Sequence, residues 1–202
     1  DSLKRDYFSE KANDYDQKKS RTQNVNNIAQ TILKEVSFSK DMNIMDFGSG
    51  TGLLLSNIAP QVNKITAIDI SASMNGVLKS KQNTIDCELE IFEIDITKET
   101  IDKKFDGIIS SMTIHHIEDV PTLFKTFYSL LNKGGFIALA DLDKEDGSFH
   151  TADTGVFHHG FERNEFLSMA KSAGFKNLKI QTASELNRPT GHYPIFLLTG
   201  KK

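Results

Sequence analysis

A glycine-rich turn is the stretch of this sequence whose residue types and spacing are best suited to chemistry. An apolar run at residues 43–47 breaks into Gly48, Ser49, Gly50, Thr51 and Gly52, and a leucine-rich segment follows. Alternate glycines allow positive φ and lack the Cβ atoms that would hold a bound molecule away from main-chain N–H groups. Such N–H groups at the start of a helix favour a polar or anionic partner. The stretch predicts a strand, a ligand-binding turn and a helix, although a turn without a ligand also fits it.

Two aspartates follow the next two predicted strands. Asp69 ends the first of these strands and Asp95 ends the second. A carboxylate can accept two hydrogen bonds at once, so Asp69 is suited to both hydroxyls of a ribose, and Asp95 to the exocyclic amine of a base. A flat base would then lie among Ile70, Met74 and Ile96. Together these residues indicate an adenosine-containing cofactor, whereas either aspartate alone could merely stabilise a turn.

Histidines and one further aspartate are the candidates for acceptor chemistry. His115, His116, Asp141, His150 and His158 stand on segments that can reach the same edge of a parallel sheet. Histidine titrates near neutrality and can take a proton from a nucleophile, but no single residue is assigned as catalytic, and His116 also fits internal packing.

Metal binding is not predicted from the sequence. His158 and His159 could pair with His150, but no carboxylate and histidine spacing typical of a zinc site accompanies them.

Short apolar strands that alternate with amphipathic helices must position these groups. Strands are predicted at 43–47, 64–70, 88–94, 105–111, 136–140, 178–182 and 193–199, and helices at 25–36 and after residues 52, 71, 120 and 165. This order predicts an α/β fold with a doubly wound, Rossmann-like sheet of seven strands. The sheet is expected to be mostly parallel, with helices on both faces and an antiparallel C-terminal strand. Lys133, Gly134 and Gly135 are expected to stop the helix that follows residue 120.

The carboxyl ends of the strands define the predicted binding edge. Gly48 to Gly52, Asp69, Asp95, Ser111 and Asp141 all stand where a predicted strand ends. Ligands of open α/β sheets bind at this edge, near the point where the strand order reverses. We expect one domain over residues 1–202, with an N-terminal arm at 1–23, a core at 24–202 and an acceptor-site lid at 143–160.

Composition narrows the class of partner. A net charge of -3 gives no general attraction to nucleic acid, and 38% hydrophobic with 25% charged residues is typical of a globular chain. The one cysteine, Cys87, cannot form an internal disulfide, which favours a reducing, cytoplasmic setting. Apolar runs such as 136–140 are too short to cross a bilayer, so no membrane partner is expected.

The glycine pattern points away from a dinucleotide. A dinucleotide fingerprint needs a glycine where Leu53 stands, which disfavours an NAD-dependent oxidoreductase. The run Met45 to Gly52, with Asp69, Asp95 and the strand at 105–111, instead resembles the class I S-adenosylmethionine-dependent methyltransferases. Residues 7–16 are similar to the N-terminal arm of the ubiquinone-biosynthesis-like branch of that family. His115-His116-Ile117 and Asn132 to Phe136 are similar to its later motifs.

This resemblance implies a role for each matching residue. It implies that the methionine part of S-adenosylmethionine lies over the glycine turn, that Asp46 holds its amino group, that Asp69 binds the ribose and that Asp95 meets the adenine amine. Tyr15 would close over the sulfonium. The full implied cofactor set is Tyr15, Asp46, Gly48, Ser49, Gly50, Gly52, Asp69, Ile70, Met74, Asp95, Ile96, Ser111 and Met112, and the acceptor set is Tyr7, Tyr15, His115, His116, Asp141 and His158.

The function so implied is methyl transfer from S-adenosylmethionine to a small-molecule acceptor by in-line displacement. The acidic balance and the lack of a basic stripe disfavour a nucleic-acid acceptor. An RNA or protein methyltransferase and a non-catalytic homologue that binds an adenosyl ligand stay open as alternatives. The sequence leaves open the acceptor, the methylated atom and the oligomeric state.

Overall fold

The computed structural model describes residues 2–150 and 155–202, and side chains from Lys18 onward within those ranges. The helices are α1 (Ser2–Glu35), α2 (Leu53–Ile58), α3 (Ala72–Ser80), α4 (Val120–Leu130) and α5 (Arg163–Ser172), with short 3-10 turns at η1 (Ala59–Gln61), η2 (Gln82–Thr84) and η3 (Ile114–His116). The strands are β1 (Asn43–Phe47), β2 (Lys64–Ile68), β3 (Glu88–Phe92), β4 (Phe105–Ser111), β5 (Leu131–Leu142), β6 (Lys176–Arg188) and β7 (Gly191–Lys201).

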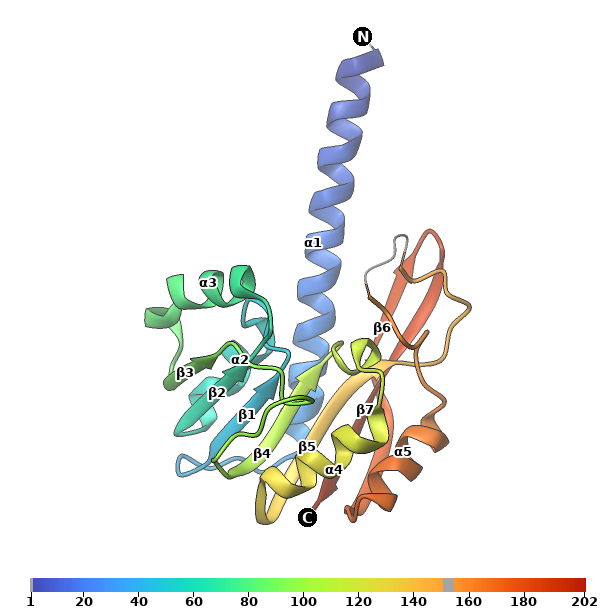
Figure 1. The fold of residues 1–202 in the computed structure, drawn as a ribbon. Coiled ribbons are helices and arrows are strands. Elements are labelled where there is room, and N and C mark those ends of the chain that lie inside the picture. The colour runs from blue at the N-terminus through green and yellow to red at the C-terminus, as the bar shows by residue number, and fades with distance from the viewer. Residues whose placement is uncertain (1, 151–154) are drawn as a thin grey trace.

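The seven strands form one sheet in the order β3-β2-β1-β4-β5-β7-β6 (Figure 1). The first five are parallel, and β7 is antiparallel to both β5 and β6. The predicted α/β fold class is confirmed, including the antiparallel C-terminal strand. The order of the strands reverses between β1 and β4, so the carboxyl ends of these two strands are where this fold binds ligands.

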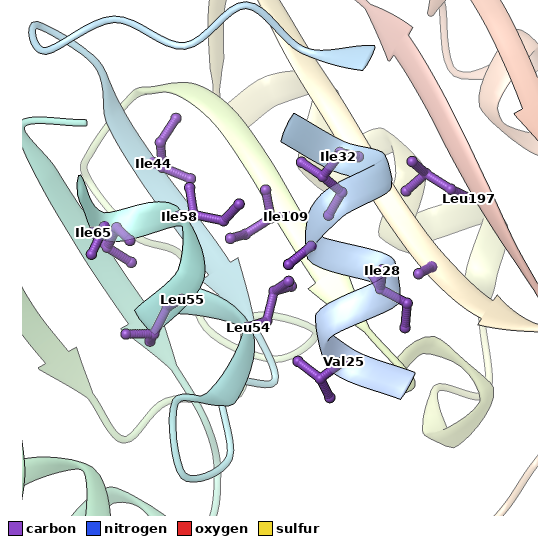
Figure 2. Packing of buried hydrophobic residues seen from close by; sticks show 14 of the residues in the cluster. Val25, Ile28, Ile32, Ile44, Leu54, Leu55, Ile58, Ile65, Ile109 and Leu197 are labelled. Atoms are coloured by element: carbon purple, nitrogen blue, oxygen red, sulfur yellow. The ribbon is translucent and has the colours of Figure 1, made fainter. Parts of the chain in front are cut away.

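Alternating side chains of β1 face two separate cores. Ile44 points to the core that α1 and α2 cover, and Met45 points to the core beneath α4 and α5. Figure 2 shows Val25, Ile28 and Ile32 of α1 packed over the first face. Full burial of an aliphatic side chain of this kind stabilises a fold by roughly 1.5–3 kcal/mol. This packing fixes the C-terminal half of α1 against the sheet.

Helix α1 is continuous from Ser2 to Glu35, so the structure has no break at the predicted boundary after residue 23. Its N-terminal half extends past the carboxyl edge of the sheet (Figure 1). The side chains of Tyr7 and Tyr15 precede Lys18 and are therefore outside the described part of the chain, so their predicted roles stay predictions.

Several predicted boundaries were wrong. Strands β2 and β3 end earlier than predicted, which leaves Ile70 and Ile94 in loops. Helix α4 ends at Leu130, before the expected glycine stop, because β5 begins at Leu131 and pairs irregularly until Phe136. The C-terminal hairpin is longer than predicted: backbone pairing with β7 carries β6 out to Arg188 through a polar run that lacks an alternating pattern.

No helix in residues 2–150 or 155–202 is both long and apolar enough to cross a bilayer.

Candidate cofactor and acceptor site

A cavity of about 500 Å³ opens at the carboxyl edge of the sheet, beside the glycine turn. Its wall consists of residues from α1, the end of β1, the glycine turn, α2, α3, the end of β4, η3, the loop after β5 and the end of β6. The sequence-predicted residues that line it are Asp46, Gly48, Ser49, Gly50, Met74, Ser111, Met112, His115 and His116. A second hollow, of about 570 Å³, lies at the opposite edge near the starts of β4 and β5 and includes none of the predicted site residues.

The glycine turn forms the floor of the cavity. The N–H groups of Gly48 and Ser49 donate to the carbonyl of Ile68, which ties the turn to β2. Gly48 has φ of 74°, and a Cβ there would lie 2.2 Å from the side chain of Thr113. Gly50 also has positive φ, but a Cβ there meets nothing within 4 Å, because this position faces open space. A side chain at residue 50 would therefore occupy room that a ligand can use.

The carboxylate of Asp69 fixes this turn by hydrogen bonds. One oxygen accepts a hydrogen bond from the N–H of Gly50 at 2.8 Å, and the other accepts one from the N–H of Ser71 at 2.9 Å. Ser71 in turn caps α3 by accepting from the N–H of Met74. Asp69 is not part of the cavity wall. Each carboxylate oxygen has a further lone pair, so the ribose role of Asp69 stays a prediction.

The residues expected around a flat base are not gathered into one pocket. Ile70 is 72% exposed, Met74 is 43% exposed and Ile96 belongs to the core beneath α4. Asp95 accepts hydrogen bonds from the N–H and hydroxyl of Thr97, which is the turn-stabilising alternative considered for it. Its contact with an adenine amine stays a prediction.

Two buried oxygen atoms of cavity-lining residues have no hydrogen-bond partner in the described part of the chain. They are Oδ2 of Asp46 and Oδ1 of Asn24. Burial raises the pKa of Asp46 to about 7, the negative charge of Asp69 adds to the rise, and a contact with Ser49 offsets part of it. Buried polar atoms without partners are rare. Two unpaired acceptors on residues that line one cavity indicate a ligand that brings N–H donors, and a cationic amine suits the carboxylate best.

The end of β4 is strained where it meets the cavity. Met112 has φ of 56°, an uncommon backbone conformation for a residue other than glycine, and its N–H donates to the carbonyl of Ala140. The hydroxyl of Ser110 donates to the carbonyl of Phe47, which binds β4 to β1. Strained backbone of this kind gathers at ligand sites.

Three histidines meet on the acceptor side of the cavity. His115 is 2% exposed, and its Nδ1 lies 2.7 Å from Oδ1 of the fully buried Asp141, whose Oδ2 accepts the N–H of His115. The ring centroids of His116 and His150 lie 4.2 Å and 5.2 Å from that of His115. Burial, followed by the neighbouring histidines, lowers the pKa of His116 and of His150.

Asp141 and His158 do not line the cavity, although the sequence placed both in the acceptor set. Asp141 lies beneath His115 and orients it. His158 donates from Nε2 to the carbonyl of Ile117 at 2.8 Å, and its own N–H donates to the carbonyl of His115. The observed contacts of His158 position the η3 turn, and direct contact with an acceptor stays a prediction for both residues.

The cavity wall also includes two arginines, Arg21 on α1 and Arg188 at the end of β6. The guanidinium of Arg188 donates to the carbonyl of Phe149 at 3.1 Å and lies 4.0 Å from the centroid of that ring. Burial lowers the pKa of Arg188, and the charge of Arg21 contributes to the shift. Neither Arg21 nor Asn24 was predicted as a site residue, because both stand in a polar stretch of α1 without a motif. Only the longer hairpin carries the side chain of Arg188 to the cavity.

The loop at 143–160 is fastened at its two ends. The N–H groups of Lys144 and Glu145 donate to the carbonyls of Phe161 and His159, and the ring of Phe149 packs on Tyr193. Residues 151–154 are outside the described residues. A closing motion of this loop stays a prediction.

Comparison with known proteins defines the class. The family model described as a methyltransferase domain matches residues 20–180, so the chain belongs to the methyltransferase domain family. This match leaves the ubiquinone-biosynthesis-like branch as a prediction.

Individual relatives agree with this class. An uncharacterized methyltransferase of Schizosaccharomyces pombe is 29% identical over 163 residues, which cover 72% of this chain and 57% of that protein. Phosphoethanolamine N-methyltransferase 1 of Zea mays is 29% identical over 155 residues, covering 73% and 30% respectively. The chain thus spans little more than half, or less, of the length of these relatives. The solved structure of Haemonchus contortus phosphoethanolamine N-methyltransferase 2 in complex with S-adenosyl-L-methionine has a TM-score of 0.70 at 15% identity, covering 86% of this chain and 52% of that one.

Proposed function

We propose that this chain is an S-adenosylmethionine-dependent methyltransferase that acts on a small-molecule acceptor carrying an anionic group. The observation that carries the cofactor is the unpaired Oδ2 of buried Asp46, in the same cavity as the open Gly50 position. A methionine amino group is a cation with N–H donors, and the unpaired oxygen of Asp46 lacks such a donor. Family membership, and the S-adenosyl-L-methionine in the related Haemonchus structure, support the same ligand.

The residues present fit such a cofactor. Asp46 and Asn24 would accept from the amino group, Gly48 to Gly50 would lie under the methionine part, and Asp69 would hold both the turn and the ribose. When bound, S-adenosylmethionine supplies an electrophilic methyl group: the lone pair of the acceptor forms the new bond to carbon, and the electrons of the C–S bond stay on sulfur. The task of the protein is then to align the acceptor and exclude water, and such positioning contributes about 7–11 kcal/mol in well-oriented reactions.

The anionic acceptor is proposed from the two arginines of the cavity wall. An arginine fork matches a phosphate or carboxylate, and placing Arg21 near Arg188 without an anion is electrostatically unfavourable. An acceptor held by this pair on one side would present its nucleophile to His115 and His116 on the other. The names of the maize and Haemonchus relatives, both phosphoethanolamine N-methyltransferases, support a phosphorylated or otherwise acidic small molecule. The overall charge of -3 supports a small anion over an RNA.

The cofactor half of this proposal is tested by calorimetry with S-adenosylmethionine, S-adenosylhomocysteine and NAD. We expect S-adenosylhomocysteine to bind and NAD not to bind. Asp69→Ala should weaken binding by on the order of 2–3 kcal/mol, through loss of the ribose contacts and of the brace on the turn. Binding of NAD without S-adenosylhomocysteine would falsify the proposal.

The acceptor half is tested by release of S-adenosylhomocysteine over a panel of phosphorylated and carboxylated amines, thiols and phenols, each beside its neutral analogue. We expect turnover with acidic members of the panel. Turnover only with RNA or with a protein would establish the alternative acceptors, and cofactor binding without turnover on any acceptor would favour the non-catalytic homologue. The cytoplasmic setting expected from the single cysteine remains part of this proposal.

A further inference from the structure

The cluster formed by His115, His116 and His150 has the composition of a metal site. Each residue offers one ring nitrogen, and these three nitrogens lie within 4.8 Å of one another. Two come from the η3 turn after β4 and one from the loop after β5, so they are joined only by the tertiary fold. We propose that this cluster binds a divalent transition metal ion, with Zn²⁺ as the first choice.

The hydrogen bonds of the cluster engage Nδ1 of His115 and of His116 and leave Nε2 of each ring for a metal ion. Nδ1 of His115 donates to Asp141, so Nε2 of the same ring carries the lone pair that a metal requires. A metal-bound histidine almost always donates its other nitrogen to a carboxylate or carbonyl in this way. Asp141 is itself held by the N–H groups of His115 and Leu142, which fixes the orientation of the pair.

The other two histidines complete the donor set. Nδ1 of His116 lies 3.4 Å from the carbonyl oxygen of Gly155, which again leaves Nε2 as the metal ligand. Nδ1 of His150 is buried and has no hydrogen-bond partner among the described residues. A metal ion bound at this nitrogen would supply the missing partner, and a metal ion bound at the other nitrogen would hold the ring in a rotated position. An apolar packing role for His150 would leave the orphan unexplained.

The geometry needs only a small closure. Three nitrogens at about 2.0–2.1 Å from a tetrahedral zinc ion lie about 3.3 Å apart. The observed separation of up to 4.8 Å is brought to that value by rotation of the partly exposed rings of His116 and His150, while His115 stays fixed on Asp141. Imidazole ligands select zinc, cobalt, nickel or copper over magnesium or calcium.

Three protein ligands leave one position of a tetrahedral site open, and all three histidines line the cavity proposed for the acceptor. An acceptor hydroxyl or thiol in the open position would lose its proton to solvent near neutral pH, as ligands of zinc do. This catalytic role rests on the proposed function, whereas metal binding does not.

The test uses the full chain, stripped with a chelator and titrated with Zn²⁺ in competition with a chromogenic chelator. We expect one ion per chain. His116→Ala or His150→Ala should weaken zinc binding by at least about 10-fold, because loss of a residue that only hydrogen-bonds to a metal ligand already costs that much. The matched control is His159→Ala, a substitution in the same loop at a side chain that is 60% exposed and outside the cluster. It should leave zinc affinity unchanged. Melting curves without metal check that each variant folds.

Co²⁺ provides a second measurement, because tetrahedral cobalt absorbs strongly in the visible range and octahedral cobalt does not. The proposal is overturned if zinc affinity is the same in His116→Ala and His150→Ala as in the wild type. It is equally overturned if His159→Ala weakens binding as much as they do, or if bound cobalt is octahedral. Calorimetry of S-adenosylhomocysteine on the metal-free wild type reports separately on the proposed function, so either idea can fail while the other stands.

Discussion

Replacing Asp46 by asparagine should stabilise the ligand-free protein and weaken the cofactor. The carboxyl group is buried, and its pKa is raised from 3.8 to about 7. The native state therefore holds a proton between these two pH values that the unfolded chain releases. Stability must fall as pH rises from about 4 to about 7 and stay level above that range. At 1.36 kcal/mol for each pH unit, the cost of ionising Asp46 at pH 8 is on the order of 4 kcal/mol, as an upper limit, since water in the cavity relieves part of it.

The measurement is urea unfolding followed by circular dichroism at pH 5 and pH 8. The stability gained by Asp46→Asn should be about 1.5 kcal/mol at pH 5 and rise to about 4 kcal/mol at pH 8, both as upper limits and with unchanged m-value. Asp41→Asn is the matched control, because Asp41 is exposed and should show no pH-dependent gain. In calorimetry, Asp46→Asn should weaken S-adenosylhomocysteine by roughly 1.5–3 kcal/mol, the usual worth of a hydrogen bond to a charged group.

Two results would refute this reasoning in different ways. If Asp46→Asn has the same pH slope as the wild type, the carboxylate is not desolvated in the native state. If the variant gains stability at pH 8 but binds S-adenosylhomocysteine with unchanged affinity, the unpaired oxygen does not meet the cofactor, and the site must be placed elsewhere in the cavity.

Three further predictions concern the glycine turn, the arginine side of the cavity and the histidine cluster. Gly48→Ala should destabilise the fold by more than about 2 kcal/mol in urea unfolding, because its Cβ overlaps a side chain, whereas Gly50→Ala should cost about 1–2 kcal/mol from positive φ and mainly reduce cofactor affinity in calorimetry. Arg188→Gln should raise KM at least about 10-fold for anionic acceptors and leave neutral analogues unaffected; an equal rise for both would contradict an anion site. Asp141→Asn should lower zinc affinity about 10–100-fold and destabilise the protein, and unchanged zinc affinity would show that His115 is not a ligand.

The sequence by itself determined the sheet and its binding edge. Apolar runs with period two, helical stripes and the glycine turn are local signals, because a strand or a helix start depends on residues close in the chain. The seven strands were therefore found, and Gly48, Ser49 and Gly50 were placed in the site. Boundaries were wrong where pairing overrides local preference. The polar end of β6 is a strand only because β7 offers it hydrogen bonds.

Only the tertiary structure decided which side chains meet in the cavity. Arg21 and Asn24 carry no motif, and they reach the cavity because apolar residues such as Ile28 fix α1 across the sheet. The raised pKa of Asp46 depends on burial, which its neighbours in the sequence do not specify. The histidine cluster likewise joins His150 to a turn more than thirty positions earlier in the chain, a separation over which spacing rules for metal ligands carry no information.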